Sequence, residues 1–387
     1  MKIVRVCFYL VITAVVMLAV LFAIWTDRSY LDMHTTVKNR IESVFSQLLF
    51  KDFFDHAYYS YLRTTNRSHF NEVTFLSDGR LMFDKQGERL FIDDRVNEII
   101  FLNDHLHDNG TPFLYVRAPN KLQDISLLPI AFSDSTIISD GDFILDLLRE
   151  SGLSTIDLRA EMENEGLDFY SSFFKGDHHW TIEKALWAFG RIATFINSEY
   201  GFSIDEKTWD PGHYEPVTIK RGFLGEEAQA VNAFHRYEDI TALIPKFHTD
   251  FTVTNIRNLY DPHFVSAGSF IEVFTPKLLD ESTTEFDYDD LNVVHRFFNR
   301  YENTEAGEKR NILLVMDSMG MPLASFFAVA FETVDNLYLV NHDTNYKIWT
   351  AIDKNDYDLV VFLLSDVVVN YEEAILFEND RLYFGRP

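Results

Sequence analysis

The sequence has little cysteine and few basic residues. One cysteine in 387 residues excludes a disulfide-stabilised scaffold. Lysine and arginine number 34 against 60 aspartate and glutamate residues, so the formal net charge is −26. Because this excess of carboxylates repels phosphate groups, a nucleic-acid-binding protein is excluded and attraction to an anionic membrane surface is disfavoured.

What the chain does contain is apolar and aromatic material. Hydrophobic residues make up 47% of the sequence, and 36 residues are phenylalanine. A disordered chain lacks this content. The length allows one large domain or two ordinary ones. The composition therefore indicates an acidic globular body with a sizeable core.

The N-terminal end of the chain has a different character. Cys7 to Trp25 form an uninterrupted uncharged run, long enough as a helix to cross a bilayer. Lys2 and Arg5 precede the run and Asp27 follows it. The positive-inside rule then places the N-terminus in the cytoplasm and the body outside the cell. The alternative, a cleaved signal peptide, is disfavoured by the length of the run and by the lack of a small-x-small cleavage site after it.

These features predict four segments. A cytoplasmic N-terminus (1–6) leads into a transmembrane signal anchor (7–25), a helical juxtamembrane linker (26–69) and an extracytoplasmic body (70–387). The single cysteine lies in the anchor, so the body has no thiol and must be stabilised by its core. Because the segment 1–26 holds two basic and no acidic side chains, the rest of the chain carries a net charge of −28.

Apolar runs in the body alternate with helical patterns. Three nearly continuous Ile/Leu/Val/Phe runs, at 312–316, 336–340 and 358–364, are typical of parallel strands buried on both faces. Helices are expected near 321–331 and 345–353, between these strands. This alternation predicts βαβ units, and therefore an α/β fold with a central parallel sheet.

The earlier part of the body contains further elements. We expect a hairpin over 71–83 with an Asp-Gly turn, strands at 112–117 and 155–158, and helices at 91–108, 141–151 and 181–200. Thr181 is the expected N-cap of the last helix, which ends before Gly201. Residues 205–300 do not fit the alternation and are interpreted as an irregular insertion.

One candidate for chemistry follows the strand at 312–316. Asp317 and Ser318 come directly after this strand and before a helix, at the sheet edge where α/β folds place their sites. A tight turn there exposes the Ser318 hydroxyl, and helix N–H groups can stabilise an oxyanion. The G-x-S-x-G pattern is absent. The alternative is that Asp317 or Ser318 only caps the following helix.

The second candidate is the segment from Lys175 to Thr181. Asp177 and His179 are two residues apart, so in an extended loop both side chains project to the same side. A carboxylate on Nδ1 orients the imidazole and leaves Nε2 for proton transfer, as in a Ser-His-Asp triad. His179 is therefore a candidate general base. We expect His178 to face the other way, as a packing or hydrogen-bonded residue, and Trp180 to form a wall of the site.

A metal site is the rival interpretation of Asp-His-His. It requires a third ligand, and the remaining histidines show neither H-x-x-x-H nor C-x-x-C spacing. His105 and His107, on a predicted helix, do not face each other. We therefore expect no metal or organic cofactor.

Taken together, the segments resemble a known family. Gly-Asp-His-His-Trp-Thr, which begins at Gly176 and follows Ile156-Asp-Leu-Arg in the chain, resembles the DHHW family of bacterial exported proteins. It is also similar to the SGNH-like acetyltransferase domains of the alginate O-acetylation machinery. The resemblance extends to the Asp78-Gly-Arg-Leu-Met-Phe hairpin and to Val116-Arg-Ala-Pro-Asn-Lys.

The resemblance implies an SGNH-hydrolase-like α/β/α sandwich with Ser318 as nucleophile, His179 as base and Asp177 as its orienting partner. Trp180, His178 and Asn299 would contact the substrate, and Asn299 is also a candidate oxyanion donor. The implied activity is acetyl transfer to a cell-surface glycan, often beside a membrane-bound O-acyltransferase. The charge of the body favours a neutral or mixed glycan over a polyanionic one.

The chain departs from this family at one position. Met316 stands where GDS-type sites have glycine, which leaves the activity of the site open. Two alternatives to transfer therefore remain: a carbohydrate acetylesterase that uses the same triad, and a catalytically inactive glycan-binding or scaffold partner of an acetylation complex.

Overall fold

The computed structural model describes residues 69–70, 72–83, 92–132, 135–231, 237–256, 262–280, 282–290, 298–339 and 348–366. The predicted anchor (7–25) and nearly all of the predicted linker (26–69) lie outside these residues. Within the described ranges, no helix is both long and apolar enough to span a membrane.

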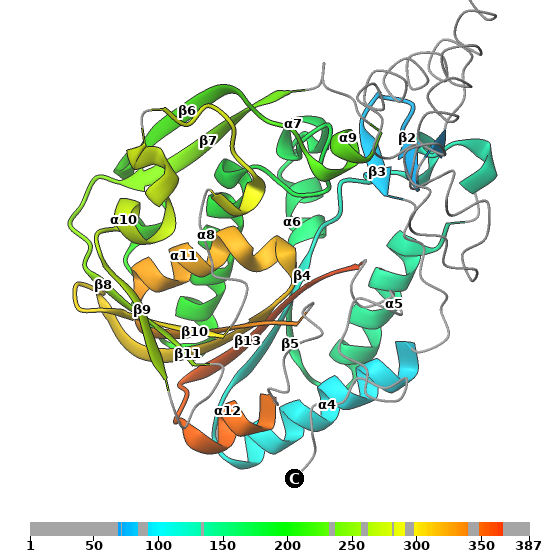
Figure 1. Cartoon of the computed structure of the whole chain (residues 1–387). Helices are drawn as coiled ribbons and strands as arrows, with labels where there is room; N and C mark the ends of the chain where they lie inside the picture. Colours follow the sequence, from blue (N-terminus) through cyan, green and yellow to red (C-terminus); the bar gives the residue numbers. More distant parts are fainter. Residues whose placement is uncertain are drawn as a thin grey trace, which may run out of the picture. The chain divides into compact units, whose positions relative to one another are not determined.

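An eight-stranded sheet forms the centre of the described chain, in the order β5-β4-β13-β11-β12-β10-β8-β9 (Figure 1). The strands are β4 (Phe113–Ala118), β5 (Ser154–Asp157), β8 (Phe251–Asn255), β9 (His263–Gly268), β10 (Asn299–Asn303), β11 (Glu308–Met316), β12 (Phe331–Tyr338) and β13 (Leu359–Ser365). Five strands, from β5 to β12, are parallel, which confirms the βαβ prediction.

The predicted central parallel sheet is confirmed only in part, because the sheet as a whole is mixed. β10, β8 and β9 extend the sheet beyond β12 by antiparallel pairing. β8 and β9 lie in the segment 205–300 that was expected to be irregular, and β10 begins at its end. They were missed because they are short and only partly buried: in β8, Phe251 and Val253 are buried while Thr252 between them is exposed, and no residue of β9 is buried. Such half-buried strands lack the continuous apolar runs of a parallel core.

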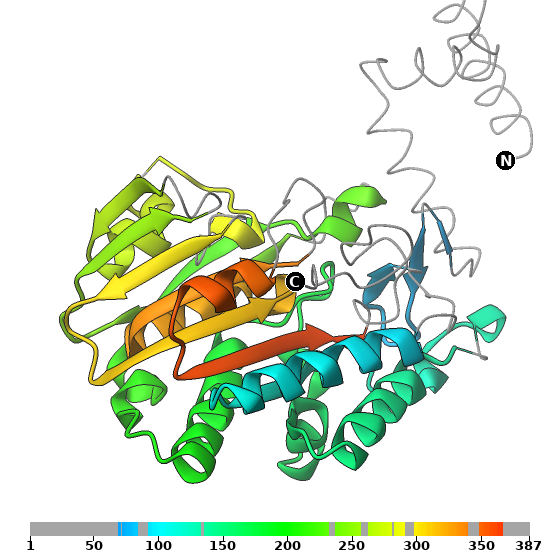
Figure 2. The ribbon, with the colours of Figure 1, turned by 90° about the horizontal axis from the view of Figure 1, so that it is seen from below.

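Helices cover both faces of the sheet, as Figures 1 and 2 show. One face carries α4 (Ile92–Asp108), α5 (Ile137–Glu150) and α12 (Ile348–Lys354), and the other carries α6 (Leu158–Asn164), α8 (Ile182–Tyr200) and α11 (Met321–Ala330). Alternate residues of β11 divide between two cores: Leu314 and Met316 pack with α8 and α11, whereas Leu313 and Val315 pack with α4 and α5. The architecture is therefore an α/β/α sandwich around a mixed sheet.

Local signals located the main helices and turns correctly. Thr181 caps α8 by accepting a hydrogen bond from the Lys184 N–H, and Gly201 ends the helix at φ 69°. The Asp-Gly turn joins β2 (Val73–Phe75) to β3 (Leu81–Phe83), with Gly79 at φ 89°. β1 (His69–Phe70) pairs with β2 on the other side.

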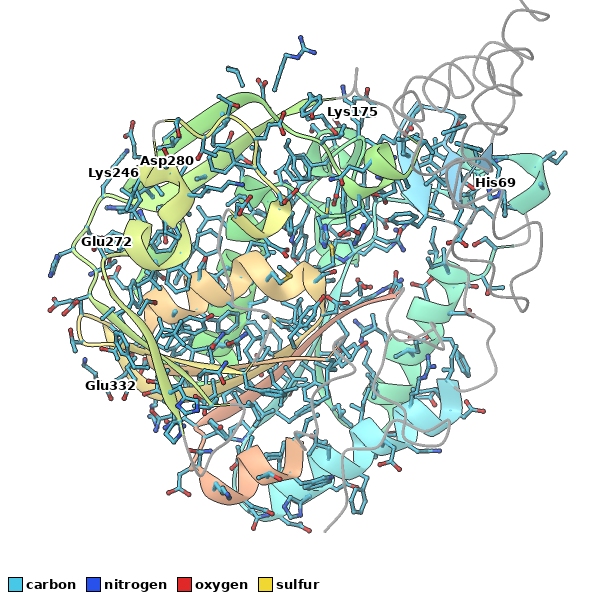
Figure 3. The ribbon with its side chains drawn as sticks, viewed as in Figure 1. His69, Lys175, Lys246, Glu272, Asp280 and Glu332 are labelled. Carbon is cyan, nitrogen blue, oxygen red and sulfur yellow. The ribbon has the colours of Figure 1, made fainter. Side chains whose placement is uncertain are left out.

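Further elements complete the described part of the chain. They are α7 (Phe169–Ser172), the ribbon of β6 (Tyr214–Phe223) and β7 (Glu238–Pro245), α9 (Glu226–Ala230), α10 (Phe270–Phe274) and the short 3₁₀ helices. Charged side chains such as Lys246, Glu272, Asp280 and Glu332 lie at the periphery (Figure 3) and are exposed. The negative charge therefore includes acidic groups on the surface.

Candidate active site

The Asp-His-His-Trp segment forms a closed loop between α7 and α8. Phe173 and Trp180 form an antiparallel bridge across its base. The Phe174 N–H donates to the carbonyl of His179 at 3.1 Å, and the Thr181 N–H donates to the carbonyl of Ser172 at 3.0 Å. Because both ends are hydrogen-bonded to each other, residues 175–179 are held as a tight turn.

Neighbouring elements hold this turn from outside. The Lys121 Nζ donates to the carbonyl of Asp177 at 2.6 Å, and the Leu81 N–H donates to the carbonyl of Lys175 at 2.8 Å. The carboxylate of Glu238 accepts hydrogen bonds from the N–H groups of Lys175 and Gly176. The loop is therefore positioned by β3, β7 and the segment after β4.

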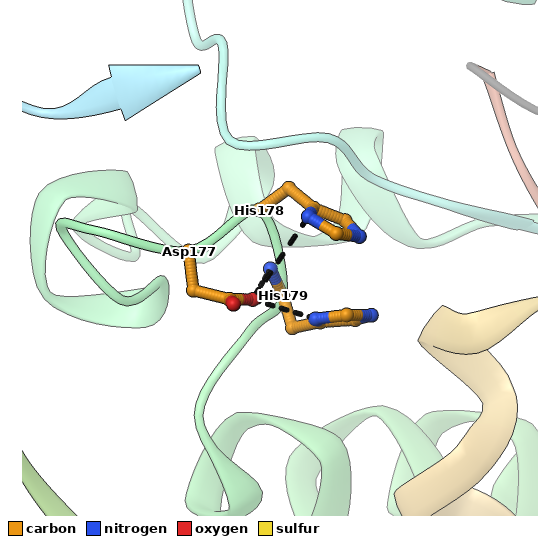
Figure 4. Close-up of side chains that lie close together, drawn as sticks. All are labelled: Asp177, His178 and His179. Carbon is orange, nitrogen blue, oxygen red and sulfur yellow. Dashed lines mark hydrogen bonds and ion pairs between the residues drawn. The ribbon is translucent and has the colours of Figure 1, made fainter. Parts of the chain in front are cut away.

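Within the loop, Asp177 and His179 form the predicted pair. The Oδ1 of Asp177 lies 2.6 Å from the Nδ1 of His179 and also accepts the His179 N–H at 2.9 Å (Figure 4). Its Oδ2 accepts the N–H of Glu226 at 2.8 Å. The buried Nε2 of His179 has no hydrogen-bond partner among the described residues, Ser318 included.

Asp177 is suited to remain a carboxylate. Burial by itself would raise the pKa of Asp177. The charges of His179 and His178, the hydrogen bond to the His179 ring and the N–H of Glu226 outweigh this effect and hold the pKa below its usual range. A permanent carboxylate on Nδ1 fixes the imidazole orientation and stabilises the imidazolium formed during proton transfer.

Trp180 connects this loop with the Ser318 turn. Its side chain is fully buried, and its Nε1–H donates to the carbonyl of Met319 at 3.1 Å. The two segments that the sequence singled out, far apart along the chain, are therefore in direct contact. Trp180 packs between the two segments and has no exposed surface, so its expected contact with the substrate stays a prediction.

Ser318 begins a single 3₁₀ turn, η9 (Ser318–Gly320), at the end of β11. Asp317 caps this turn: its Oδ1 accepts the Met319 N–H at 2.9 Å and its Oδ2 accepts the Ser365 N–H at 2.7 Å. Asp317 therefore caps the 3₁₀ turn, whereas the residue that precedes the following helix α11 is Gly320. Ser318 itself is half-buried and lies at the carboxyl edge of the parallel strands.

Electrostatics also show that the loop and the turn are neighbours. Burial raises the pKa of Asp317. The hydrogen bonds from Ser365 and Met319 and the charge of the nearby His179 lower this pKa, but burial has the larger effect. The Met319 and Gly320 N–H groups both donate to Asp317, to its side chain and its carbonyl respectively. In this turn, the Ser318 N–H is consequently the backbone donor available to an oxyanion.

The structure also explains how the turn accommodates Met316. This residue is fully buried on the side of the sheet that faces α8 and α11. A Cβ on Gly320 would lie 2.5 Å from the Cβ of Met316 and 2.8 Å from its Sδ. Met316 fills the space that would be empty if residue 316 were glycine. Gly320, which has no side chain, leaves room for the Met316 side chain.

His178 does not face away from the site as expected. Its ring lies beside that of His179, with centroids 3.9 Å apart and planes inclined by 37°. Its Nδ1 lies 3.5 Å from the Oε1 of Glu227. The expectation was wrong because residues 175–179 form a tight turn, in which neighbouring side chains need not alternate as they do in an extended strand.

Asn299 lies elsewhere. It is fully buried at the start of β10, and its hydrogen bonds include those with Asn255 and Asn336 of the neighbouring strands. Asn336 pairs in turn with Leu314, which lies in β11 before the Ser318 turn. Two strand spacings, roughly 10 Å, separate β10 from β11. The structure thus does not bring Asn299 to the Ser318 turn.

Sequence reasoning missed several residues that contact the loop. Tyr288, in the 3₁₀ helix η8 (Tyr288–Asp290), stacks on His179 with centroids 4.1 Å apart and an interplanar angle of 11°. Glu226, Glu227 and Lys121 contribute further contacts to the loop. Tyr288, Glu226 and Glu227 lie in the segment 205–300, which carries no motif that could have indicated them.

The same loop is the place where a metal could be considered. Asp177, His178 and His179 offer ligand atoms within 4.8 Å of one another. However, the Oδ1 of Asp177 and the Nδ1 of His179 satisfy one another at 2.6 Å. This arrangement favours proton transfer by a hydrogen-bonded pair, and it disfavours a metal centre at these residues.

Comparison with known proteins agrees with this geometry. Residues 75–250 match the model of the SGNH hydrolase-like domain of the acetyltransferase AlgX. The match includes the Asp177–Trp180 loop and ends before the Ser318 turn. No curated protein compared with the chain is significantly similar to it in sequence. The match of residues 75–250 confirms the resemblance to SGNH-like acetyltransferase domains that the sequence indicated.

Solved structures share the fold at low identity. PatB1 of Bacillus cereus, solved with a sulfonyl adduct, is 15% identical with a TM-score of 0.61, over 78% of this chain and 96% of that chain. A DHHW family protein from Eubacterium siraeum is 16% identical with a TM-score of 0.55, over 80% and 98% respectively. Together with the family match, these structures show that the described body has the SGNH-like α/β fold.

Proposed function

We propose that the protein is a membrane-anchored, extracytoplasmic O-acetyltransferase that acts on a cell-surface polysaccharide through Ser318, His179 and Asp177. The proposal is supported by the match of residues 75–250 to an acetyltransferase domain. The observation that carries it is the contact between the two catalytic segments: Trp180 of the Asp177–His179 loop hydrogen-bonds to Met319 of the Ser318 turn.

The proposed reaction has two half-reactions. In the first, the Nε2 of His179 takes the proton of the Ser318 hydroxyl while its oxygen bonds to the acetyl carbon. The bond from that carbon to the donor's alcohol oxygen then breaks, and His179 returns the proton to this oxygen. In the second, a sugar hydroxyl gives its proton to His179, attacks the acetyl-serine and releases Ser318, which recovers the proton.

The residues around the triad have matching tasks. Asp177 holds the imidazole by its Nδ1, and the Ser318 N–H stabilises the tetrahedral oxyanion. Among the described residues, no hydrogen bond joins the Nε2 of His179 to Ser318 in the free protein. Such catalytic bonds commonly tighten only when substrate is bound.

The same machinery would serve an acetylesterase, with water in place of the sugar hydroxyl. An inactive glycan-binding partner of an acetylation complex is a second alternative. The Asp177–His179 pair, in contact with the Ser318 turn through Trp180, favours an enzyme over this alternative. A membrane-bound O-acyltransferase remains the proposed source of acetyl groups.

The proposal is tested with the full-length chain purified in detergent. We expect it to release 4-nitrophenol from 4-nitrophenyl acetate, with or without EDTA, and Ser318→Ala to abolish this activity. Ser198→Ala, an exposed serine on α8, is the matched control. If Ser318→Ala and wild type react at the same rate, the triad proposal is wrong.

Transfer and hydrolysis are separated in a second assay. Adding a polysaccharide acceptor should divert the acetyl group from water to the glycan, detected by mass spectrometry. Acetate release without any acetylated glycan would favour the esterase.

A further inference from the structure

Glu227 is a buried carboxylate that the proposed triad does not use. It lies on α9 with none of its surface exposed, and neither of its carboxylate oxygens has a hydrogen-bond partner among the described residues. Two cationic groups lie near its Oε1: the Nδ1 of His178 at 3.5 Å and the Nζ of Lys121 at 4.0 Å. A carboxylate without hydrogen bonds is costly to bury, so its position calls for a function.

The imidazole that faces Glu227 lies beside the proposed general base. The rings of His178 and His179 lie side by side, and Figure 4 shows both extending away from Asp177 in the same direction. The His178 side chain is 35% exposed, whereas that of His179 is 6% exposed. His178 therefore lies on the solvent side of the base, where a substrate arrives.

The groups around His178 favour its charged form. Glu227 and Glu226 face it from α9 and Asp177 from its own loop, while Phe83 of β3 contributes an uncharged ring. Burial would lower the pKa of His178, but these three carboxylates raise it to about 9. At neutral pH both ring nitrogens then carry protons, so the Nε2–H is a donor.

We propose that Glu227 is a positioning residue for His178, and that His178 donates its Nε2–H to the alcohol oxygen of the substrate, beside the Nε2 of His179. This inference rests on the proposed function. The general base exchanges its proton with the alcohol oxygen that leaves or attacks, so a donor next to the base faces that oxygen. Negative charge develops there as the bond to the acetyl carbon breaks, and a fixed cation stabilises it.

A series of acetyl esters with leaving groups of rising basicity tests this role. We expect His178→Gln and Glu227→Gln to lower kcat roughly 10- to 100-fold for an alkyl acetate. The loss should be less than about threefold for 4-nitrophenyl acetate, whose leaving group needs little stabilisation. Glu183→Gln, an exposed carboxylate on α8, is the matched control. An equal loss for all leaving groups would show that His178 does not act on the alcohol oxygen.

The charge of His178 is measured separately, by NMR of histidine-labelled protein in which His178→Gln identifies the resonance. We expect titration near pH 9 in wild type, and a midpoint closer to the ordinary histidine value of about 6.5 in Glu227→Gln. If His178 already titrates near the ordinary value in wild type, Glu227 does not hold its charge and the inference fails.

The outcomes separate this inference from the proposed function. A wild-type protein that hydrolyses no ester contradicts the proposed function, whatever the NMR result. An active wild type whose Glu227→Gln variant retains full activity on every ester contradicts only the role of Glu227. Thermal unfolding of each variant shows whether a loss of ester hydrolysis reflects misfolding. His178→Gln changes the more exposed partner of the His178–Glu227 contact and is therefore a second test of that contact.

Discussion

The contact between Met316 and Gly320 gives the sharpest test of how the Ser318 turn is built. In Gly320→Ala, the new Cβ would lie 2.5 Å from the Cβ of Met316, whereas ordinary contacts begin at 3.4 Å. The strand end and the turn would thus have to separate by about 0.9 Å. Because Gly320 has φ −76° and ψ −14°, values that alanine adopts readily, any loss comes from this overlap and not from backbone strain.

Two opposing effects set the magnitude. Replacing glycine by alanine at compatible dihedral angles stabilises a protein by about 0.4–1 kcal/mol. Overpacking a core costs about 1–3 kcal/mol. We therefore expect Gly320→Ala to lower the free energy of unfolding by about 1–2 kcal/mol, and to lower esterase activity by displacing Ser318.

A double-mutant cycle isolates the overlap. Met316→Gly removes the Cβ, Cγ and Sδ that the new methyl group meets, whereas Met316→Ala leaves the Cβ at 2.5 Å. The double variant of Met316→Gly with Gly320→Ala should be more stable than the sum of the two single losses predicts, by about 1 kcal/mol or more. For Met316→Ala with Gly320→Ala, this favourable coupling energy should be smaller. Urea unfolding of the full-length chain, followed by tryptophan fluorescence, measures both couplings.

Two results would refute this reasoning. If Gly320→Ala unfolds at the same or a higher urea concentration than wild type, the turn has room for a side chain and Met316 does not support it. If both double variants show additive losses, the destabilisation of Gly320→Ala has another origin. If Gly320→Ala keeps full esterase activity, the contact between Met316 and Gly320 does not determine the position of Ser318.

Three further results are expected. Trp180→Phe should cost about 1–3 kcal/mol of unfolding free energy and slow ester hydrolysis, because the buried Met319 carbonyl loses its donor; unchanged activity would argue against this link. Asp177→Asn should lower kcat by roughly 10³-fold or more, and adding Ser318→Ala should cause little further loss, because the residues act as a unit. The folded-state pKa of Asp177 is depressed, so its contribution to stability is present above about pH 4 and is lost as pH falls below that value. Thermal unfolding from about pH 6 to about pH 3 should therefore show the gap between wild type and Asp177→Asn narrowing; a constant gap would contradict the assigned charge.

Much of the fold could be predicted from local patterns. The parallel strands β11, β12 and β13 follow from continuous apolar runs, and α8 follows from its N-cap at Thr181 and the glycine after it. The antiparallel strands β8 and β10 escaped prediction because they bury one face only, and β9 because none of its residues is buried. Alternation over such short strands in an aromatic, acidic segment is too weak a signal to separate a strand from a loop.

The site divides in the same way. Asp177 and His179 could be paired from their spacing, because a two-residue separation is short enough for local geometry to bring a carboxylate to a ring. The orientation of His178 could not be predicted in this way. It depends on the closed turn and on Glu227, which approaches from α9, a helix that comes after α8 and β6 in the chain.

The sequence by itself thus determined the βαβ elements, the acidic surface and the Asp-x-His pair, since each depends on composition or on neighbours along the chain. Only the tertiary structure decided which distant segments meet. The order of strands in the sheet sets where along the carboxyl edge Ser318 lies, and the buried Trp180–Met319 hydrogen bond joins that edge to the histidine loop. The tertiary structure also placed Asn299 two strands away from β11 and brought Tyr288 and Glu227 to the histidine loop. Such contacts depend on the shape of the folded core and have no periodic pattern in the sequence.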